Sequence, residues 1–334
     1  MSGQAHPTVS LCIPTIGRTD YLAQLLRSVE RQTFTETEIL ILDNASPRDV
    51  VGDYLNPFLR QNRNAIHLRV ESRIPMFANF NRGIAAARGR YVVFFHDDDD
   101  YAPTLIERSV ALLEANTEAG FAGTNYDLID EHDSVTERRR WIRATRVVAG
   151  RHYIEDLVSR GRNIVPMPGI VFRRGAIARG FDESLPIHFG DFVLLMRIAE
   201  ERAVALIADP LIRVRRHAAQ ASQGVPFSRG IALRTRVLLS YLDEYEGRHP
   251  GERAFVERLR KRAAIVHRTG LAWGWVVATD SSEARACVNA FGSSVFDAPA
   301  KVLLGALDHA GVRRIVGSRR MQETLRRLAR RLRM

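Results

Sequence analysis

Four consecutive aspartates, Asp97–Asp100, follow His96 directly after the apolar run Tyr91–Phe95. Carboxylates packed this closely repel one another, and each raises the proton affinity of its neighbours. The arrangement becomes favourable when a divalent cation lies among them, and oxygen ligands suit Mg²⁺ or Mn²⁺, which commonly join carboxylates to substrate phosphates. The alternative is a solvated acidic loop that caps the helix expected near Pro103, a role that suits Asp100. For Asp97–Asp99 we favour the cation site.

Three further polar residues could take part in chemistry, each with an ordinary structural alternative. Asp43 is either an Asx-turn residue or a carboxylate that accepts a hydrogen bond from a nucleotide base. Asp191 is either the N-cap of a helix or a general base that removes a proton from a substrate hydroxyl. His217, in Arg215-Arg216-His217, is a surface histidine, a metal ligand or a phosphate contact, and the sequence does not decide among these.

The elements that would position these side chains alternate between strands and helices in the first third of the chain. The expected strands are Val9–Pro14, Glu38–Leu42, Ile66–Glu71 and Tyr91–Phe95, and the expected helices are Tyr21–Gln32, Val50–Arg60 and Pro75–Ala87. Such repeats predict an α/β fold with a mostly parallel sheet flanked by helices on both sides. Ligands bind at the carboxyl ends of the strands in such sheets. The polar residues just past these ends are Thr15, Arg18, Asp43, Arg73 and His96–Asp100.

The rest of the chain divides into a continuation of this domain and a helical region. The expected elements are a helix over Leu105–Asn116, a strand over Phe121–Asp130, a polar Arg-rich stretch over Glu131–Arg146, a strand over Val165–Phe172, a helix over Asp191–Glu201, a strand over Ala203–Ile212 and a polar loop over Arg213–Gln223. Thr19 and Asp20 are candidate caps for the first helix. From about Ser228 onward the chain reads as helical, which places the boundary between residues 1–225 and 226–334.

The charge of the chain is unevenly distributed. Its net charge is +11, and Arg313–Met334 alone holds nine arginines and one acid. Leucines spaced three and four apart make this tail a basic amphipathic helix, which fits either an anionic membrane surface or an ordinary solvated helix packed on the domain. No apolar stretch is long enough to cross a bilayer, and no signal segment is recognisable. We therefore expect a cytoplasmic protein that can dock on the inner face of the plasma membrane.

Three segments resemble the family 2 inverting glycosyltransferases, which have the GT-A fold. VSLCIPTIGRTDYLAQLLRSVERQTFTETEILILDNAS resembles their opening, NRGIAAARGRYVVFFHDDDDYAPTLIE their metal-binding DxD segment, and GFDESLPIHFGDFVLLMRIAE the segment of their catalytic base. The match runs from about Val9 to His217 in the expected order. Two departures stand out, because His96 replaces the first acid of the usual DxD triplet and Gly190 stands where relatives often have Glu.

The resemblance implies a role for each candidate residue. It implies nucleotide binding by Thr15, Ile16, Arg18, Asp43, Arg73 and Asp97, metal binding by Asp98 and His217, contact with the donor sugar or acceptor by Asp99 and Arg216, and general-base catalysis by Asp191. It further implies Mn²⁺ or Mg²⁺ as cofactor, a UDP- or dTDP-sugar as donor, and a glycan or lipid-linked acceptor. Bacterial cell-surface polysaccharide synthesis is the process that we expect.

Other classes of protein fit the sequence less well. A nucleotidyltransferase would share the sheet and the metal-binding carboxylates, but PTIGRTD lacks the Gly-rich triphosphate loop that such enzymes carry after the first strand. A catalytically degenerate sugar-nucleotide-binding protein is the non-enzymatic alternative, and the presence of Asp43, Asp98 and Asp191 argues against it. Nucleic acid is not an expected partner, because only the charge of the tail suggests it.

Overall fold

The computed structural model describes residues 7–217 and 227–277. These residues group into two compact units, one made of residues up to 154 together with 163–217, the other of 155–162 together with 227–277. The expected domain boundary near Val225 lies between the two described ranges and stays a prediction. The basic tail of Arg313–Met334 also lies outside the described residues.

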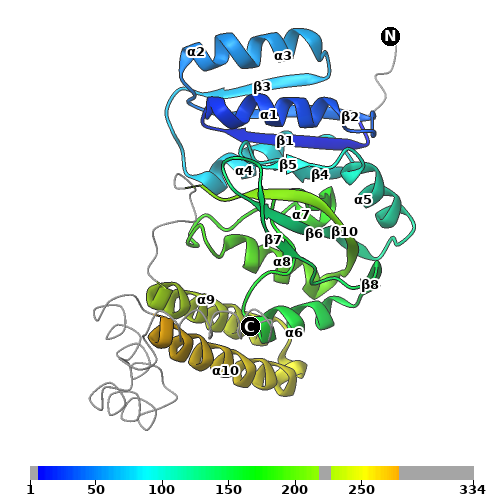
Figure 1. Cartoon of the computed structure of the whole chain (residues 1–334). Coiled ribbons are helices and arrows are strands. Elements are labelled where there is room, and N and C mark those ends of the chain that lie inside the picture. Colours follow the sequence, from blue (N-terminus) through cyan, green and yellow to red (C-terminus); the bar gives the residue numbers. More distant parts are fainter. Residues whose placement is uncertain (1–6, 218–226, 278–334) are drawn as a thin grey trace. The chain divides into compact units, whose positions relative to one another are not determined.

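A sheet forms the centre of the first unit (Figure 1). Its strands are β1 (Val9–Thr15), β2 (Thr37–Asn44), β3 (Ala65–Val70), β4 (Tyr91–Phe94), β5 (Asp100–Tyr101), β6 (Ala119–Ile129), β7 (Val135–Arg139), β8 (Arg146–Val148), β9 (Val171–Arg173) and β10 (Ala203–Arg215). The main path runs β3-β2-β1-β4-β9-β6-β10-β5, with β7 paired to β6 and β8 to β10.

The two halves of this sheet differ in strand direction. The pairs β3/β2, β2/β1 and β1/β4 are parallel, as the alternation of strands and helices predicts, and so is β6/β10. By contrast, β9 is antiparallel to both of its neighbours, and β5, β7 and β8 also pair antiparallel. The α/β class is confirmed, and the parallel half brings the ends of β1, β2 and β4 to one edge.

Helices cover the sheet, and their apolar faces form the core with it. Their bounds are α1 (Thr19–Glu30), α2 (Arg48–Val50), η1 (Val51–Leu55), α3 (Asn56–Gln61), α4 (Met76–Ala86), α5 (Leu105–Glu114), α6 (Gly150–Arg160), α7 (Arg174–Ile177) and α8 (Gly190–Glu201), and of α6 only residues 150–154 belong to the first unit. In α1, Leu22, Leu25 and Val29 recur at helical spacing, and all three are buried in the core formed with β1 and β2. This burial fixes α1 beside the carboxyl ends of these strands.

Three expected segments differ from the structure. Of the expected strand Val165–Phe172, only Val171 and Phe172 lie in a strand, β9, because Pro166 and Pro168 have no N–H for a ladder and Gly169 has φ +77°. The Arg-rich stretch contains β7, whose residues are largely exposed and pair with β6. The expected loop Arg213–Gln223 begins too early, because β10 continues to Arg215.

The expected caps also differ. The N-cap of α1 is Arg18 rather than Thr19 or Asp20, and the guanidinium of Arg18 binds carboxylates instead of the helix. Asp100 caps no helix, because it lies in β5 and forms ion pairs with Arg31 and Arg213. Asp191 is not the N-cap of α8 but lies within its first turn, which leaves its carboxyl free of that role.

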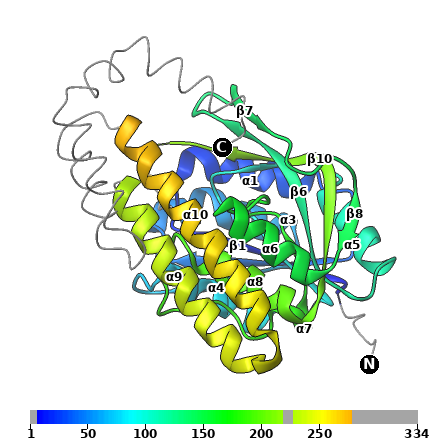
Figure 2. The same cartoon turned by 90° about the horizontal axis from the view of Figure 1, so that it is seen from below.

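The second unit is helical, as the sequence predicts. Its helices α9 (Phe227–Arg248) and α10 (Arg253–Val277) are joined by η2 (Pro250–Glu252) and lie side by side (Figure 2). Thr235 bonds Nδ1 of His267 across the pair at 2.7 Å, and Arg262 ties α10 to Glu155 at 2.8 Å. In the two described ranges, no helix is both long enough and apolar enough to span a bilayer.

Candidate active site

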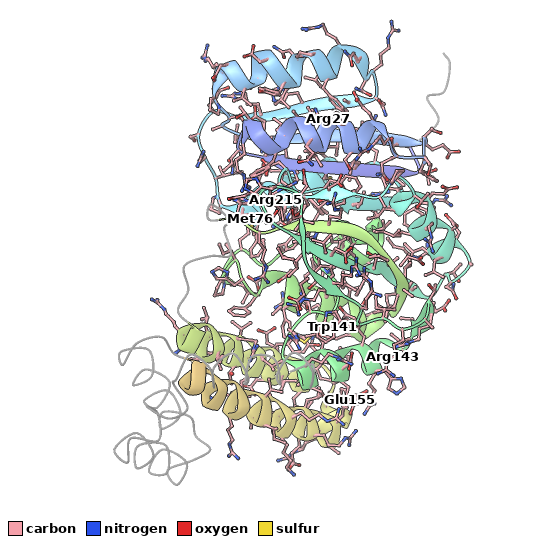
Figure 3. The ribbon with its side chains drawn as sticks, viewed as in Figure 1. Arg27, Met76, Trp141, Arg143, Glu155 and Arg215 are labelled. Atoms are coloured by element: carbon pink, nitrogen blue, oxygen red, sulfur yellow. The ribbon has the colours of Figure 1, made fainter. Side chains whose placement is uncertain are left out.

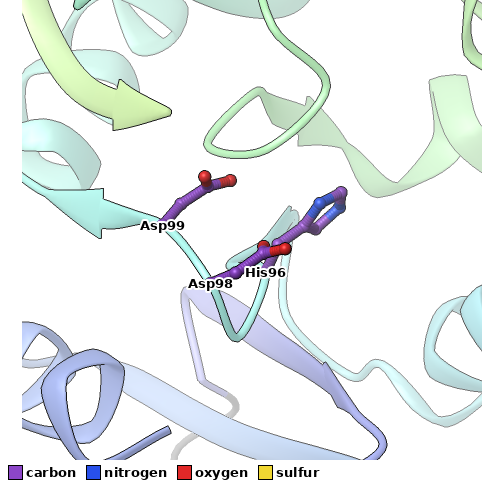
Figure 4. Close-up of side chains that lie close together, drawn as sticks. All are labelled: His96, Asp98 and Asp99. Atoms are coloured by element: carbon purple, nitrogen blue, oxygen red, sulfur yellow. The ribbon is translucent and has the colours of Figure 1, made fainter. Parts of the chain in front are cut away.

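The aspartate run lies on the loop after β4, at the edge where the parallel strands end. Asp97, Asp98 and Asp99 are buried, with exposed fractions of 2%, 8% and 4%. Ligand atoms of His96, Asp98 and Asp99 lie within 4.8 Å of one another, and Figure 4 shows the three side chains together on this loop. Buried carboxylates at this spacing require compensating positive charge.

Asp97 is held by the end of β1 and the start of α1. The hydroxyl of Thr15 donates to Oδ2 of Asp97 at 2.7 Å, and Nη2 of Arg18 donates to Oδ1 at 2.9 Å. The backbone N–H of Ile16 also donates to this carboxylate. Burial raises the pKa of Asp97, and Arg18 offsets part of this effect. Four of the predicted nucleotide-binding residues therefore meet here, from two strand ends far apart in sequence.

Asp98 is surrounded by cationic and imidazole groups. Nη1 of Arg18 lies 3.1 Å from its Oδ2, and Nε2 of His217 lies 3.0 Å from the same atom. Burial alone would raise the pKa of Asp98, but interactions with His96, Arg18 and His217 hold it below its usual range. The structure thus brings together Asp98 and His217, the two predicted metal ligands, and keeps Asp98 ionised.

His96 and Asp99 complete the cluster. Nε2 of His96 is buried and has no hydrogen-bond partner among the described residues, and burial lowers the pKa of this imidazole. An unsatisfied ring nitrogen beside two carboxylates is a donor set that suits a divalent cation. Burial and the neighbouring Asp98 raise the pKa of Asp99 well above its usual range. The residues present therefore fit a cation, and His96 is a candidate ligand that sequence reasoning missed because it replaces an expected acid.

Asp43 lies at the end of β2, in register with Thr15 of β1. Its side chain has an exposed fraction of 0%, and its Oδ2 lies 2.8 Å from Nε2 of His67 and 2.7 Å from Nη1 of Arg69. Its Oδ1 accepts the backbone N–H of Ser46 at 2.8 Å. Burial would raise the pKa of Asp43, and these hydrogen bonds together lower it. The partly exposed groups at this position are therefore His67 and Arg69, which the sequence analysis did not name.

Asp191 lies in the first turn of α8. Its Oδ2 accepts a hydrogen bond from Nδ2 of Asn163 at 2.9 Å, and its Oδ1 accepts the N–H of Phe192 at 2.8 Å. Burial raises the pKa of Asp191 to about 6 despite these bonds. A carboxyl with such a pKa can take up a proton near neutral pH, as a general base must.

A group of aromatic rings connects the start of α8 to the aspartate run. Gly190 packs against Phe77, where an added Cβ would lie 2.3 Å from the ring. Phe77 stacks on Phe181 at 5.0 Å between centroids, and Phe181 meets Phe80 edge-on at 5.3 Å. Phe80 in turn lies 5.5 Å from the ring of His96. Glycine at 190 lets this aromatic ring approach the backbone beside Asp191.

Three arginines near the site differ in their placement. Arg73 and Arg216 are exposed and take no part in the ion pairs described above. Arg215, which no sequence argument singled out, has an exposed fraction of 1%, and its backbone N–H donates to Oδ1 of Asp99 at 2.9 Å. Successive side chains of a strand point to opposite faces of the sheet. A strand continued through this segment would therefore have predicted that Arg215 faces inward and Arg216 outward.

Comparison of the sequence with known proteins shows which family the chain resembles. A model of glycosyl transferase family 2 matches residues 10–181. An uncharacterised glycosyltransferase of Rickettsia typhi is 24% identical over 271 residues, covering 78% of this chain and 75% of that protein. One from Rickettsia bellii is 27% identical over 129 residues, or 39% of this chain, but the match spans only 18% of that protein. The GalNAc(5)-diNAcBac-PP-undecaprenol beta-1,3-glucosyltransferase of Campylobacter jejuni is 27% identical over 116 residues, covering 35% of this chain and 36% of that protein.

Solved structures share the fold. Residues 1–349 of TarS from S. aureus, in complex with UDP-GlcNAc, match with a TM-score of 0.63 and 16% identity over 96% of this chain and 91% of that one. The mannosyltransferase PcManGT from Pyrobaculum calidifontis, in complex with GDP-Man and Mn²⁺, matches with a TM-score of 0.53 and 16% identity over 96% and 85% of the two chains. The fold is therefore that of these glycosyltransferases, as the resemblance implies.

Proposed function

The chain belongs to glycosyl transferase family 2, and on this basis we propose that it moves a sugar from a nucleoside-diphosphate donor to a hydroxyl of a glycan or lipid-linked acceptor, with inversion at the anomeric carbon. The protein is a glycosyltransferase. The nucleotidyltransferase alternative has no further support, since the matching family and the named relatives transfer sugars.

The contrast between Asp98 and Asp191 is the observation that carries this proposal. The first carboxyl is held ionised by Arg18, His217 and His96, whereas burial keeps the pKa of the second near 6. Two acids whose surroundings push their pKa values apart are suited to different tasks in one reaction. Asp98 then serves as the permanently charged ligand, and Asp191 as the group that exchanges a proton.

Asp98 is the first candidate to hold Mn²⁺ or Mg²⁺, with His96, Asp99 and His217 as further candidate ligands. A divalent cation, when bound, supplies positive charge that stabilises the leaving nucleoside diphosphate. The unsatisfied Nε2 of His96 supports this assignment, and the Mn²⁺ complex of the distantly related PcManGT agrees with it.

The other residues bind the donor or activate the acceptor in this proposal. Thr15 and Ile16 orient Asp97, which we assign to the ribose. Arg18, now bonded to Asp97 and Asp98, is the cation nearest to the expected diphosphate. Asp191 accepts the proton of the acceptor hydroxyl while the oxygen attacks the anomeric carbon from the face opposite the leaving group.

The base is recognised, in this proposal, through Asp43 and its two partners. Asp43 is fully buried, so it orients His67 and Arg69, and these partly exposed side chains face the base. The guanidinium of Arg69 is a hydrogen-bond donor and favours a base that presents carbonyl oxygens, which agrees with a uridine or thymidine nucleotide. We assign Arg73 to the nucleotide, and Asp99 and Arg216 to the donor sugar or the acceptor, as the resemblance implies.

The acceptor and the cellular location are part of the same proposal. The undecaprenol-linked substrate in the name of the Campylobacter jejuni relative supports a lipid-linked acceptor and cell-surface polysaccharide synthesis. A lipid-linked acceptor would bring the enzyme to the inner face of the plasma membrane, where the basic tail could bind anionic lipid. Loss of liposome co-sedimentation after deletion of residues 313–334 tests this part, and unchanged co-sedimentation would exclude it.

Thermal-shift measurements with UDP-, dTDP- and GDP-sugars, each with and without Mn²⁺, test the donor assignment. A donor at one hundred times its dissociation constant should stabilise the protein by about 2.7 kcal/mol. We expect one class of nucleotide sugar to do so only with the cation. Equal melting temperatures across the whole panel would contradict the proposal. Once a donor is known, the anomeric coupling constant of the product in ¹H NMR tests inversion, and retained configuration would refute it.

A further inference from the structure

Arg215, the last residue of β10, is bonded to three separate parts of the first unit. Its exposed fraction is 1%, and it is first among the largest fully buried side chains in the described part of the chain; Figure 3 labels it near the end of β10. Burial of a guanidinium is expensive unless its donors are satisfied, so the partners of these donors indicate what the residue holds in place.

On one side, Arg215 holds the loop that carries the candidate metal ligands. Its backbone N–H donates to Oδ1 of Asp99 at 2.9 Å, and its Nε donates to the carbonyl oxygen of Asp98 at 3.0 Å. The first bond orients a carboxylate and the second fixes the peptide that follows Asp98. The orientation of both candidate ligands therefore depends on the position of Arg215.

On the other side, the guanidinium is held by α1 and by the turn between β6 and β7. Nη2 donates to Oε1 of Gln24 at 2.9 Å and to Oδ1 of Asp133 at 2.6 Å, and Nη1 donates to the carbonyl oxygen of Asp130 at 2.9 Å. The guanidinium also lies over the ring of Tyr21, 4.9 Å from its centroid. An arginine with this many directed contacts has a single position.

Asp133 is a charged acceptor of this guanidinium, and its backbone is unusual. Its φ of +64° is rare for a residue other than glycine. The amide of Gln24 donates to both oxygens of its carboxylate at 3.1 Å. The carboxylate of Asp133, in this left-handed position of the turn, is therefore bonded both to Arg215 and to Gln24 of α1, which itself binds Arg215.

We propose that Arg215 is a positioning residue for Asp98 and Asp99, and that Asp133 fixes Arg215. The β6–β7 turn, which carries Asp133, then sets the cation affinity of the aspartate site without lining it. This inference rests on the proposed function, because it takes the aspartate run to be the cation site. The competing explanation is that the arginine only anchors the β6–β7 hairpin to α1. The two differ in whether loosening Asp133 changes the geometry of the aspartate loop.

The test uses the full chain with Asp133→Gly, which removes the carboxylate without backbone strain because glycine adopts positive φ freely. Asp133→Asn keeps one acceptor and also tolerates this conformation. Glu137→Gln is the matched control, since Glu137 lies on the same hairpin and pairs with Arg139. Arg215→Lys keeps the charge but loses the fork that reaches Asp98 and Asp133 together.

Two quantities are measured for each variant: Mn²⁺ affinity from the electron paramagnetic resonance signal of the free ion, and hydrogen exchange of peptides covering residues 96–101. Outer partners of metal ligands typically contribute 10–100-fold to metal affinity. We therefore expect Asp133→Gly and Arg215→Lys to bind Mn²⁺ at least about tenfold more weakly than the wild type does. The affinity of Asp133→Asn should fall between these values, and Glu137→Gln should bind Mn²⁺ as the wild type does. Exchange at 96–101 should rise in the same order.

The result that overturns the inference is wild-type exchange at 96–101 in Asp133→Gly and Arg215→Lys. Wild-type Mn²⁺ affinity in these two variants, with Asp98→Asn impaired, would overturn it equally. If the wild type itself binds no Mn²⁺, the cation assignment of the proposed function fails. The exchange measurement still decides in that case whether Arg215 positions the loop.

Discussion

Replacing Asp191 by asparagine should make the protein more stable at neutral pH while it removes catalysis. Burial raises the pKa of this carboxyl from 3.8 to about 6 in the folded protein. Between these two values the folded state holds a proton that the unfolded state has lost. The contribution of Asp191 to stability is therefore greatest below about pH 4, declines as the pH rises toward 6, and is constant above it.

The magnitude follows from the two pKa values. Each unit between them is equivalent to about 1.4 kcal/mol, so the ionised carboxyl lowers the free energy of unfolding at pH 7 by about 3 kcal/mol at most. Asparagine removes this penalty, but its side chain has one acceptor oxygen where the carboxylate uses two, one for Asn163 and one for Phe192. Loss of one of these bonds costs about 1 kcal/mol at every pH. The variant should be about 1 kcal/mol less stable than the wild type at pH 4 and about 2 kcal/mol more stable at pH 7.

Urea unfolding at pH 4, 5, 6 and 7 measures this difference without any substrate. Asp182→Asn is the matched control of opposite sign, because hydrogen bonds from Ser184 and the charge of Arg197 lower the pKa of Asp182. That control should lose stability at pH 7 and recover relative to the wild type as the pH falls. A stability difference for Asp191→Asn that does not change between pH 4 and 7 would show that the pKa of Asp191 is not raised in the folded protein.

Three further substitutions test other parts of the site. Asp98→Asn should weaken Mn²⁺ binding by at least tenfold, measured by the resonance of the free ion, and unchanged affinity would remove Asp98 as a ligand. Arg69→Met should reduce the preference among UDP, dTDP, GDP and ADP in a thermal-shift panel, because Arg69 is a partly exposed donor bonded to the buried Asp43; an unaltered ranking would argue against its contact with the base. Gly190→Ala should lower the free energy of unfolding by about 1–3 kcal/mol, because the new methyl group overlaps the ring of Phe77, and urea unfolding with wild-type stability would contradict this packing.

Much of the candidate site follows from a simple property of the sequence. Apolar runs of strand length end at polar residues, and parallel strands place those ends along one edge. Thr15, Arg18, Asp97 and Asp98 were predicted to lie together on this argument, and the structure joins them by direct bonds. The prediction succeeds because β1 and β4 are neighbours, so that residues 80 positions apart meet.

What the sequence does not reveal depends on side-chain direction and on contacts between distant segments. Arg69 reaches Asp43 because β3 lies beside β2 with these two residues in register, and no periodicity in β3 alone indicates this. Arg215 looks like a solvated residue among arginines, and its burial follows from the partners that surround it. The strand expected over Val165–Phe172 fails for a local reason, since its two prolines lack backbone donors.

We propose that Asp191 deprotonates an acceptor at a site where Asp98 helps to bind a nucleotide sugar. Release of nucleoside diphosphate from the stabilising donor, in the presence of acceptor and Mn²⁺, measures it most directly when donor affinity is determined on the same samples. For Asp191→Asn we predict a rate lower by about 10²–10⁴-fold, because a positioned general base contributes that much, with donor affinity unchanged within about twofold of the wild type. Turnover at the wild-type rate in this variant would contradict the account.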